Sequence, residues 1–413
     1  MALVSGPSLG RWTRRSILAE PKEVRHIRLP AGIGPAEARK AVERELSTVL
    51  RRSPPTASPH AGWIVSFGYD LGRVFEPKAC AERGAVDDRD WPLATLCWCP
   101  DAHTFDHASA TWSRIGDPPP LANECDERER RFAVGQLEET HDRAAFEQSV
   151  DRCVRLIHDG DLFQANIARR VSCPFSGSTR ALAARAFAAS GAWFGAYIEA
   201  DPGRAIISMS PELFLDFDGR SRRILTRPIK GTRPQGEDPR SLVTSAKDAA
   251  ELAMIVDLMR NDLGRICAIG SISVDAARTV ETHPTVHHTV AEISGRVRDG
   301  VDLVALLAAT FPPGSITGAP KVRAMQVIDE LESVRRGPYC GATGLIAGDG
   351  SVTLNVAIRT MALSGRGDPR RPDHLDGTLD YWAGCGIVAE SVPSSEWEES
   401  VTKSEVLLRT LAT

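Results

Sequence analysis

The chain has 413 residues, of which 42% are hydrophobic and 25% are charged, and its 50 lysines and arginines face 54 aspartates and glutamates. These proportions are those of a globular protein, and they exclude collagen-like, disordered and disulfide-scaffold classes. The net charge of −4 argues against nucleic acid as the main partner, because surfaces that bind phosphate usually carry a basic excess.

Export and membrane insertion are not expected either. No stretch of the sequence approaches the ~18 consecutive apolar residues that a membrane helix requires. Residues 1–20 are basic but lack the apolar centre of a signal peptide. The nine cysteines are odd in number and follow no framework spacing, which is typical of a reducing compartment. We therefore predict a cytoplasmic location.

The first part of the chain is predicted to form one helix and a few strands. The helix covers residues 36–51, and apolar strands begin at residues 62 and 92. Residues 117–139 are rich in proline and charged side chains and cannot bury a core face, so we place a boundary there. The predicted domains are residues 1–125 and residues 140–413.

From residue 140 onward, helices and strands alternate. Apolar residues at helical spacing predict four helices. The first ends at Gly160, and the others cover residues 247–260, 320–332 and 395–411. Strands are predicted at 163–171, 195–198, 205–208, 213–217, 342–347 and 352–363. Residues 365–377, rich in Arg, Asp and Pro, are predicted to form a surface loop. No nucleotide-binding glycine motif follows any of these strands, so a nucleotide-binding fold is not supported.

Carboxylates on two of these helices could hold a divalent cation. Glu251 lies at the border of an apolar stripe, and Glu396, Glu399 and Lys403 share one face of the last helix. Mg²⁺ is usually bound by one or two protein carboxylates together with substrate and water. The spacing of Glu399 and Lys403 also suits an ordinary intrahelical ion pair, so the pattern leaves both interpretations open.

Two glycine-rich segments could bind an anion through backbone N–H groups. Residues 311–321 form a turn that is expected to place Pro320 at the first helical position. Residues 383–387 offer backbone that a ligand can approach closely. Either segment could also be only a tight turn.

Two cations and a group of histidines complete the candidates. Arg359, expected inside the strand 355–360, requires a carboxylate from protein or ligand if it is buried. Lys230 precedes a glycine turn and could be a nucleophile if it is desolvated, although most lysines at turns are solvated. His283, His287 and His288 do not have the spacing of a zinc site and are interpreted as polar lining.

Eight segments, taken together, resemble a known family. They resemble the chorismate-utilising enzymes and, within them, the component I family of aminodeoxychorismate synthases. The segments are SPELF (210–214), RPIKGTRP (227–234), ELAMIVDLMRNDLGR (251–265), GSITGAPKVRAMQVIDELE (314–332), RGPYCGATG (336–344), NVAIRT (355–360), AGCGIVAES (383–391) and WEESVTK (397–403). A weaker resemblance at SFGYDLGRVFE (66–76) extends to the N-terminal region. The resemblance implies an α+β fold with two packed antiparallel β-sheets surrounded by helices, of which residues 1–125 are part.

The resemblance also implies a site for chorismate and Mg²⁺ between the sheets. By position, Glu251 and Glu399 match the metal-binding glutamates, with Glu396 nearby as a third that acts through a water molecule. Glu212 matches the general acid that protonates the leaving hydroxyl. The remaining matches are substrate-binding or site-lining positions: Tyr339 and Arg359 at the enolpyruvyl carboxylate, Gly384, Cys385 and Gly386 near a substrate carboxylate, and His288, Ser315 and Lys403. Many relatives have glycine where this chain has Cys385.

Two positions discriminate within the family. Relatives that add water carry a lysine base where Gln164 stands, and anthranilate synthases carry a small residue where Lys230 stands. The resemblance therefore implies amination of chorismate to 4-amino-4-deoxychorismate, toward 4-aminobenzoate and folate, with Lys230 as covalent nucleophile. No G-x-C-x-G segment of a glutamine amidotransferase is present, so ammonia is expected from a separate glutaminase subunit.

Three alternatives remain. The first is anthranilate synthase component I, against which Lys230 argues. The second is a hydroxylating isochorismate or salicylate synthase, against which Gln164 argues. The third is a catalytically silent chorismate-binding subunit, which would have no reason to keep Glu212, Lys230, Glu251 and Glu399 together.

Overall fold

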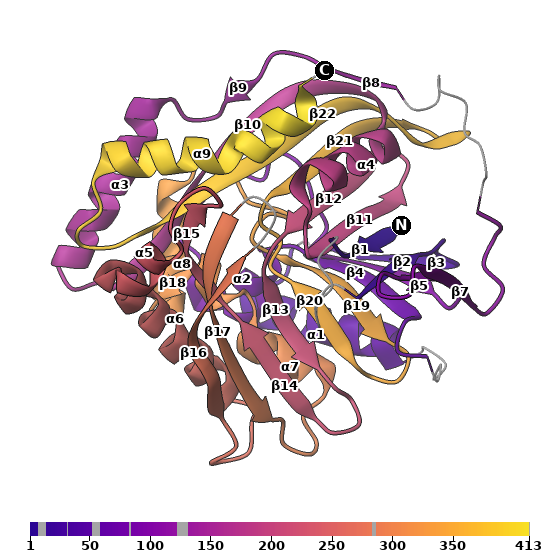
Figure 1. Ribbon diagram of the computed structural model, residues 1–413, viewed down its shortest axis with the longest axis horizontal. Helices are drawn as coiled ribbons and strands as arrows, with labels where there is room; N and C mark the ends of the chain where they lie inside the picture. The colour runs from indigo at the N-terminus through magenta and orange to yellow at the C-terminus, as the bar shows by residue number, and fades with distance from the viewer. Residues whose placement is uncertain are drawn as a thin grey trace.

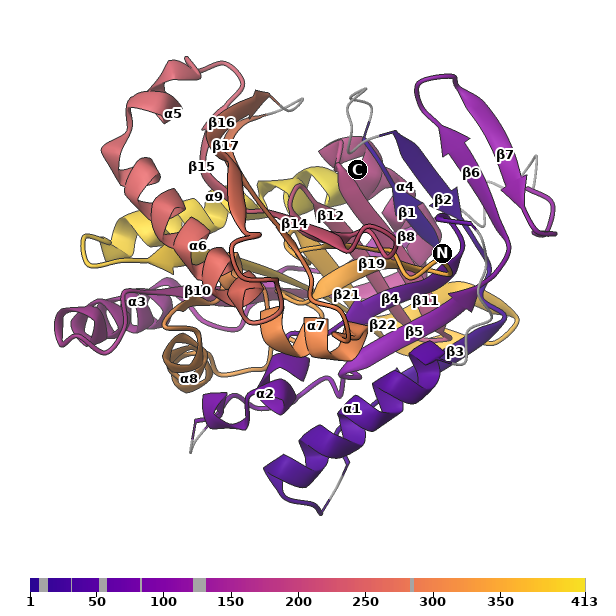
Figure 2. The same cartoon turned by 90° about the horizontal axis from the view of Figure 1, so that it is seen from below.

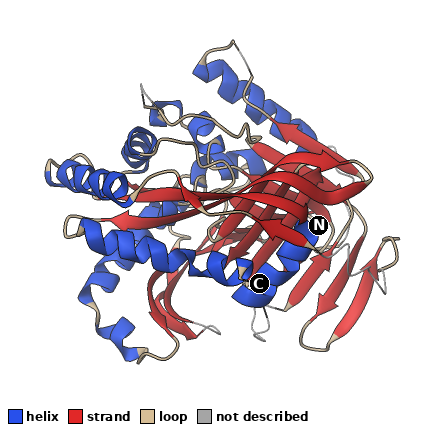
Figure 3. Cartoon of the chain, turned by 90° about the horizontal axis from the view of Figure 1, so that it is seen from above, coloured by secondary structure: helices blue, strands red, loops and turns tan. Residues whose placement is uncertain are grey.

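Two large antiparallel sheets form the centre of the protein, and helices cover them (Figures 1 and 3). The computed structural model describes residues 1–6, 14–30, 32–51, 58–81, 84–121, 131–282 and 286–412. This architecture confirms the predicted α+β fold with two packed antiparallel sheets.

The first sheet has twelve strands in the described part of the chain. Its strands, in the order in which they pair, are β18 (Gly318–Ala319), β10 (Gln164–Ser178), β22 (Arg371–Ile387), β21 (Thr360–Asp368), β12 (Arg204–Ser210), β11 (Phe194–Asp201), β1 (Ala2–Val4), β2 (Arg15–Leu18), β6 (Ala102–Asp106) and β7 (Thr111–Ile115). The short strands β8 (Phe132–Val134) and β9 (Glu138–Glu139) also pair with β10.

The second sheet has ten described strands. In pairing order they are β15 (Ile229–Pro234), β17 (Val286–Arg296), β14 (Arg223–Arg227), β13 (Leu213–Phe217), β20 (Val352–Asn355), β19 (Ala342–Ala347), β4 (Gly62–Phe67), β5 (Ala94–Cys99) and β3 (Glu23–Ile27), with β16 (Ser273–Thr282) on β17. Strands from the first 125 residues thus belong to both sheets. The apolar strand expected to begin at residue 92 corresponds to β5, which contains Cys97 and Cys99.

The helices lie on the outer faces of the sheets. They are α1 (Pro35–Arg51), α2 (Leu71–Phe75), α3 (Arg143–His158), α4 (Thr179–Ser190), α5 (Arg240–Thr244), α6 (Ala246–Gly264), α7 (Leu303–Thr310), α8 (Lys321–Leu331) and α9 (Pro393–Leu411), with the short 3-10 turns η1 (Pro77–Ala79) and η3 (Gly314–Ile316). In Figure 2, α1 and α7 are on one side of the sheets, and in Figure 1, α9 crosses β10 and β22. Three of the helices begin at an N-cap residue. The side chains of Asp142, Ser245 and Asp302 accept hydrogen bonds from backbone N–H groups in the first turns of α3, α6 and α7.

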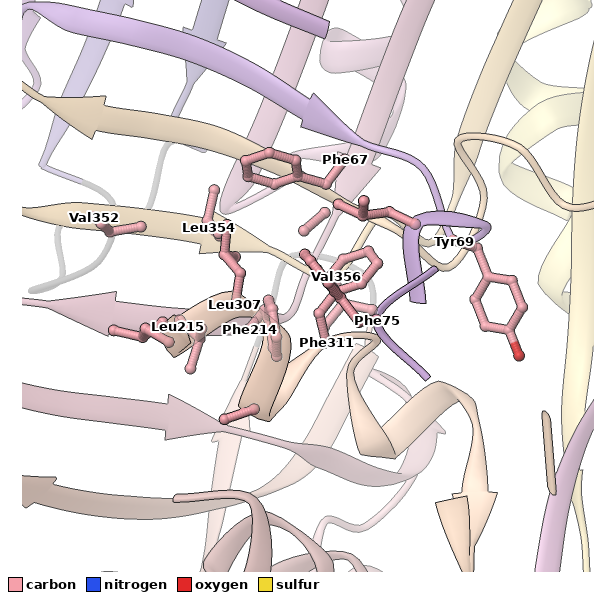
Figure 4. Close-up of a cluster of buried hydrophobic side chains, with 14 of the residues drawn as sticks. Phe67, Tyr69, Phe75, Phe214, Leu215, Leu307, Phe311, Val352, Leu354 and Val356 are labelled. Carbon is pink, nitrogen blue, oxygen red and sulfur yellow. The ribbon is translucent and has the colours of Figure 1, made fainter. Parts of the chain in front are cut away.

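Successive side chains of a strand point to opposite faces of the sheet, so one strand contributes to two layers of the core. On β4, Val65 and Phe67 belong to the cluster that includes residues of α1 and α7, whereas Ile64 belongs to a cluster that includes β11 and β12 of the other sheet. Phe311 has ring centroids 6.2 Å from Phe214 and 6.4 Å from Phe67 in edge-on contacts (Figure 4). This apolar cluster packs the second sheet against α1 and α7.

Four local predictions are wrong. Residues 365–377 are not a loop, because β21 and β22 continue as a paired hairpin through Gly365 and Gly377. Their charged residues mark a solvated strand face rather than irregular backbone. The expected strand 352–363 breaks between β20 and β21, the strand expected to end at residue 171 continues to Ser178, and α8 begins at Lys321 with Pro320 as its N-cap.

The boundary segment 117–139 is only partly irregular. Its residues Phe132–Val134 and Glu138–Glu139 pair with β10, so they belong to the first sheet. Charged and proline-rich composition therefore did not exclude edge strands here. The division into residues 1–125 and 140–413 stays a prediction.

Candidate active site

A glycine-floored surface lies where β10 and β22 pair. Asn166 is opposite Gly386 and Ala168 is opposite Gly384, so these four residues face the same side of the sheet. Gln164, two residues before Asn166, shares that face. We call this surface, made of Gln164, Asn166, Gly384 and Gly386, the glycine face.

Polar side chains converge on the glycine face and come close to its two glycines. A Cβ atom at Gly386 would lie 2.6 Å from Gln164 Nε2 and 3.0 Å from Lys230 Nζ. A Cβ atom at Gly384 would lie 3.0 Å from Asn166 Nδ2. At Gly384 a Cβ atom would also lie 2.9 Å from the carbonyl oxygen of Ile167, so the backbone disfavours a side chain there. At Gly386 a Cβ atom would displace the amide of Gln164 and the amine of Lys230.

Lys230 reaches this surface from the other sheet. It lies in β15, and its carbonyl oxygen accepts a hydrogen bond from the hydroxyl of Thr289 on β17. Gly231 follows with a φ of 77°, and the register of β15 against β17 shifts between Lys230 and Thr232. The left-handed glycine allows this shift, which brings the candidate nucleophile of one sheet onto the glycine face of the other.

Glu212 is a buried carboxyl group with a strongly perturbed pKa. Its side chain is 4% exposed, and its Oε1 accepts a hydrogen bond of 2.6 Å from Ser315 Oγ in η3. Burial raises the pKa of Glu212 to about 7, although Ser315 and the nearby charge of Lys230 act in the opposite direction. A carboxyl group with this pKa is still partly protonated at neutral pH, as a general acid requires.

Arg359 is a cation held in an unusual backbone conformation. It lies between β20 and β21 with a φ of 50° and not inside a strand, which corrects the sequence prediction. Burial lowers the pKa of its guanidinium, and no carboxylate among the described residues pairs with it. Since none of the described carboxylates balances its charge, an anionic ligand group suits this position.

Tyr339 is stacked in the core beside the site. Its ring lies parallel to that of Trp382, with centroids 5.8 Å apart and planes inclined by 5°. Trp382 precedes Gly384 by two residues on β22 and so shares its face. Burial raises the pKa of Tyr339, so its hydroxyl stays protonated and able to donate a hydrogen bond.

His287 and His288 lie on β17 and form hydrogen bonds with neighbouring residues in and next to the second sheet. His288 Nδ1 lies 2.8 Å from Thr232 Oγ1, and His287 lies within hydrogen-bond distance of Thr282 Oγ1 and the carbonyl oxygen of Gln235. Within the described ranges, no histidine belongs to a group of three possible metal ligands. His283 lies outside the described residues.

The carboxylates of α9 form the candidate metal centre. Ligand atoms of Cys385, Glu396 and Glu399 lie within 4.8 Å of one another. Ser391 Oγ donates a hydrogen bond of 2.7 Å to Glu396, and Lys403 Nζ lies 2.7 Å from Glu399 Oε1. The helical ion pair of Glu399 and Lys403 is confirmed. Glu399 also belongs to the three-residue group, and its role as a metal ligand stays a prediction.

Glu251 was expected at the metal centre, and Cys385 was expected near a substrate carboxylate. Glu251 lies half-buried on α6 and is not part of the three-residue group. The Cys385 side chain points away from the glycine face into the cluster that contains residues of α3 and α8. Burial raises the pKa of its thiol, and Sγ donates to the carbonyl oxygen of Glu396 at 3.3 Å. A protonated thiol is a poor ligand for Mg²⁺, so the oxygens of Glu396 and Glu399 are the atoms that fit this ion.

Lys403 connects the candidate metal centre to the glycine face. Its Nζ donates a hydrogen bond of 2.9 Å to the carbonyl oxygen of Gly384 while it pairs with Glu399. The lysine thereby fixes the backbone of Gly384 from the α9 side of β22.

A buried ion pair that was not predicted from the sequence is hydrogen-bonded to the backbone of β10. Arg336 and Glu332 pair at 2.6 Å with both side chains nearly inaccessible, and Arg336 also donates to the carbonyl oxygens of Asn166 and Ile316. Glu332 accepts a hydrogen bond from the backbone N–H of Ala168. The i,i+4 spacing of Glu332 and Arg336 was the available signal, although such pairs are usually exposed.

A second buried network gives the N-terminal region a role that the sequence did not indicate. Asp380 on β22 is fully buried and accepts hydrogen bonds from Arg89 at 2.7 Å and from Ser172 at 2.5 Å. Arg170 on β10 pairs with Asp88 at 2.6 Å and lies over Trp382. Residues 88 and 89 thus hold together the two strands that carry the glycine face.

The chain is similar to known chorismate enzymes. Residues 11–409 match the family of chorismate binding enzymes. The chain is 35% identical to aminodeoxychorismate synthase component 1 of Escherichia coli over 364 residues, which cover 85% of this chain and 77% of that protein. It is also 35% identical to aminodeoxychorismate synthase of Streptomyces griseus over 85% of this chain, but it spans only half the length of that relative.

A solved structure supports the same relationship. The anthranilate synthase component I of Streptococcus pneumoniae superimposes with a TM-score of 0.79 at 26% sequence identity, and the match covers 96% of this chain and 92% of that one. The chain therefore belongs to the family of chorismate binding enzymes. No helix in the described part of the chain is both long and apolar enough to cross a membrane.

Proposed function

We propose that this protein aminates chorismate to 4-amino-4-deoxychorismate. The observation that carries the proposal is the position of Lys230 Nζ on the glycine face, together with Glu212, a buried carboxyl group whose pKa is about 7. A primary amine beside a protonated carboxyl group provides a nucleophile and an acid for a leaving hydroxyl group. The relatives named aminodeoxychorismate synthase support this activity.

The proposed reaction has two substitutions. Lys230, as the neutral amine, forms a bond to C2 of chorismate while the bond between C4 and its hydroxyl breaks, and Glu212 delivers the proton with which water leaves. Ammonia then forms a bond to C4, and the bond between C2 and the lysine nitrogen breaks. Each half-reaction has its own nucleophile and leaving group, which is the usual advantage of covalent catalysis.

Gln164 supports amination over hydroxylation. Its side chain is fully buried beside Lys230, and neither of its polar atoms has a hydrogen-bond partner in the described part of the chain. A carboxamide has no basic nitrogen and cannot deprotonate water, whereas ammonia is already a nucleophile. We therefore expect ammonia, supplied by a separate glutaminase subunit, as the second substrate.

Mg²⁺ is proposed as the cofactor. Glu396 and Glu399 would hold it, with Glu251 from α6 as a further ligand, and the ion would neutralise the negative charge of a bound substrate carboxylate. Arg359 and Tyr339 are proposed to hold the enolpyruvyl carboxylate, and Ser315 keeps Glu212 oriented.

The product is proposed to enter 4-aminobenzoate and folate synthesis through a separate lyase. All cysteines in the described ranges are free, which supports a cytoplasmic, reducing setting. The anthranilate synthase reaction is the second candidate, since the solved relative with a TM-score of 0.79 carries that name. It predicts release of pyruvate and an aromatic product.

Replacement of the proposed nucleophile tests the reaction. Lys230→Ala is expected to lose most amination and to retain chorismate binding, because the anion-binding groups remain. Lys22→Ala is the matched control, since Lys22 is an exposed lysine paired with Asp101 at the surface. Rates are measured from the aminated product and binding by equilibrium titration. Unchanged turnover of Lys230→Ala would remove the covalent lysine from the proposal.

A further inference from the structure

Asn166 carries a buried hydrogen-bond donor for which the described residues provide no acceptor. The residue is 7% exposed, and Nδ2 is buried without a hydrogen-bond partner among the described residues. Its backbone is fully engaged, because the N–H donates to the carbonyl oxygen of Thr317 and the carbonyl oxygen accepts from Arg336. Since a buried unpaired donor costs stability, its retention calls for an acceptor from outside the protein.

The donor is aimed at the surface on which the reaction is proposed. Asn166 Nδ2 lies 3.0 Å from the point that a Cβ atom of Gly384 would occupy, directly over the glycine face. Gln164 Nε2 and Lys230 Nζ lie 2.6 Å and 3.0 Å from the equivalent point of Gly386. The three nitrogen atoms thus surround adjacent positions on one surface.

The chemistry of this surface selects an oxygen acceptor with negative charge. Lys230 contributes an amine, and Asn166 Nδ2 and Gln164 Nε2 are amide donors. The carboxyl group of Glu212 already accepts the hydroxyl of Ser315. A ligand carboxylate satisfies such a set of donors, and hydrogen bonds to a charged acceptor are roughly twice as strong as neutral ones.

We infer that Asn166 is a substrate-positioning residue that donates a hydrogen bond from Nδ2 to a carboxylate oxygen of the bound ligand. The inference rests on the proposed function in that chorismate is the ligand. The carboxylate on the ring is adjacent to C2, the carbon that Lys230 is proposed to attack, so a donor beside Lys230 is within reach of that group. Asn166 would hold the ring so that C2 faces the amine.

A second buried asparagine shows what a purely structural role looks like. Asn355 is 3% exposed, and its Oδ1 accepts hydrogen bonds of 2.9 Å from both the N–H and the hydroxyl of Thr343. Its Nδ2 donates to the carbonyl oxygen of Phe194 at 2.8 Å. The amide of Asn355 therefore links strands, whereas that of Asn166 faces the glycine face with its donor unused.

Substitution by leucine separates binding from stability, because leucine keeps the shape and removes the donor. Asn166→Leu is expected to raise the dissociation constant for chorismate about 10- to 100-fold, as expected for loss of a hydrogen bond to a charged group. The melting temperature should stay the same or rise. Asn355→Leu, the stability control, is expected to lower the melting temperature because it leaves paired groups without partners.

Further variants and kinetics make the result specific. Asn166→Asp replaces the donor with a negatively charged acceptor and is expected to bind chorismate more weakly than Asn166→Leu. Asn166→Ser keeps a donor and is expected to recover part of the affinity. In steady-state assays the KM for chorismate should rise with the dissociation constant while kcat changes less.

The binding measurement is a titration of the full chain with chorismate and Mg²⁺ in the absence of ammonia, followed by intrinsic fluorescence. Wild-type affinity in Asn166→Leu would overturn this inference alone. Weakened binding together with a product other than the amine would support the inference and overturn the proposed amination. A wild-type chain that does not bind chorismate would overturn both.

Discussion

Replacement of Glu212 by glutamine should make the protein more stable at alkaline pH and much less active. The carboxyl group is 4% exposed, and burial raises its pKa from an ordinary 4.5 to about 7. Such a rise means that ionising Glu212 costs the folded state roughly 3 kcal/mol more than the unfolded chain. Glutamine has nearly the same shape and remains neutral, so Glu212→Gln avoids this cost.

The sign of the pH dependence follows from proton binding. Between pH 4.5 and about 7 the folded protein keeps a proton that the unfolded chain has released. The free energy of unfolding of the wild type therefore falls as the pH rises through this range, and the full penalty of roughly 3 kcal/mol applies above pH 7. Below pH 4.5 both the folded and the unfolded wild type hold the proton, so Glu212→Gln is no more stable than the wild type there.

The assay is urea unfolding of both proteins at several pH values from 4.5 to 8.5. We expect Glu212→Gln to exceed the wild type by about 2–3 kcal/mol at pH 8.5 and to match it to within about 1 kcal/mol at pH 4.5. Amination should fall about 10²- to 10⁴-fold, because glutamine cannot deliver a proton. Glu405→Gln, on the exposed side of α9, is the control and should show no such pH dependence. A stability difference between Glu212→Gln and wild type that does not change with pH would refute the reasoning.

Three other substitutions test the supporting structure. Gly386→Ala would place a Cβ atom 3.0 Å from Lys230 Nζ and should displace the amine. We expect kcat to fall about 100-fold while the circular dichroism spectrum changes little. Full activity in this variant would show that the reacting amine does not lie at Gly386. Asp380→Ala leaves buried arginine without its carboxylate and should cost about 3–5 kcal/mol in urea unfolding, whereas a loss below about 1 kcal/mol would contradict a tightly coupled network. Glu399→Gln should weaken Mg²⁺ binding at least about tenfold in a metal titration, and unchanged affinity would exclude Glu399 as a ligand.

Periodic apolar patterns were enough to predict most of the regular elements. Helices α6 and α9 and strand β19 were expected from spacing and punctuation alone, because each buries one continuous apolar face or run. The hairpin through residues 365–377 was not predicted, because strand pairing depends on the partner strand and not on hydrophobicity alone. The break at Arg359 was also missed, because a positive φ at a non-glycine residue carries no signal in the sequence.

Residue patterns singled out Lys230, Arg359 and residues 383–387 separately, and only the family resemblance joined them into one site. Lys230 and Gly386 come from different sheets, and only the topology of the fold brings them together. The unused donor of Asn166 had no sequence signal, since nothing in the sequence shows whether an amide is paired. Glu251, which the resemblance assigns to the metal, lies outside the ligand group of α9, and its role as a metal ligand stays a prediction.

Product analysis tests the central claim most directly. The purified chain is incubated with chorismate, Mg²⁺ and ammonium at mildly alkaline pH, and the products are separated by liquid chromatography and identified by mass spectrometry. The account predicts a species with the mass of 4-amino-4-deoxychorismate that an added lyase converts to 4-aminobenzoate. Anthranilate with pyruvate, or chorismate left unreacted even with a glutaminase subunit present, would contradict it.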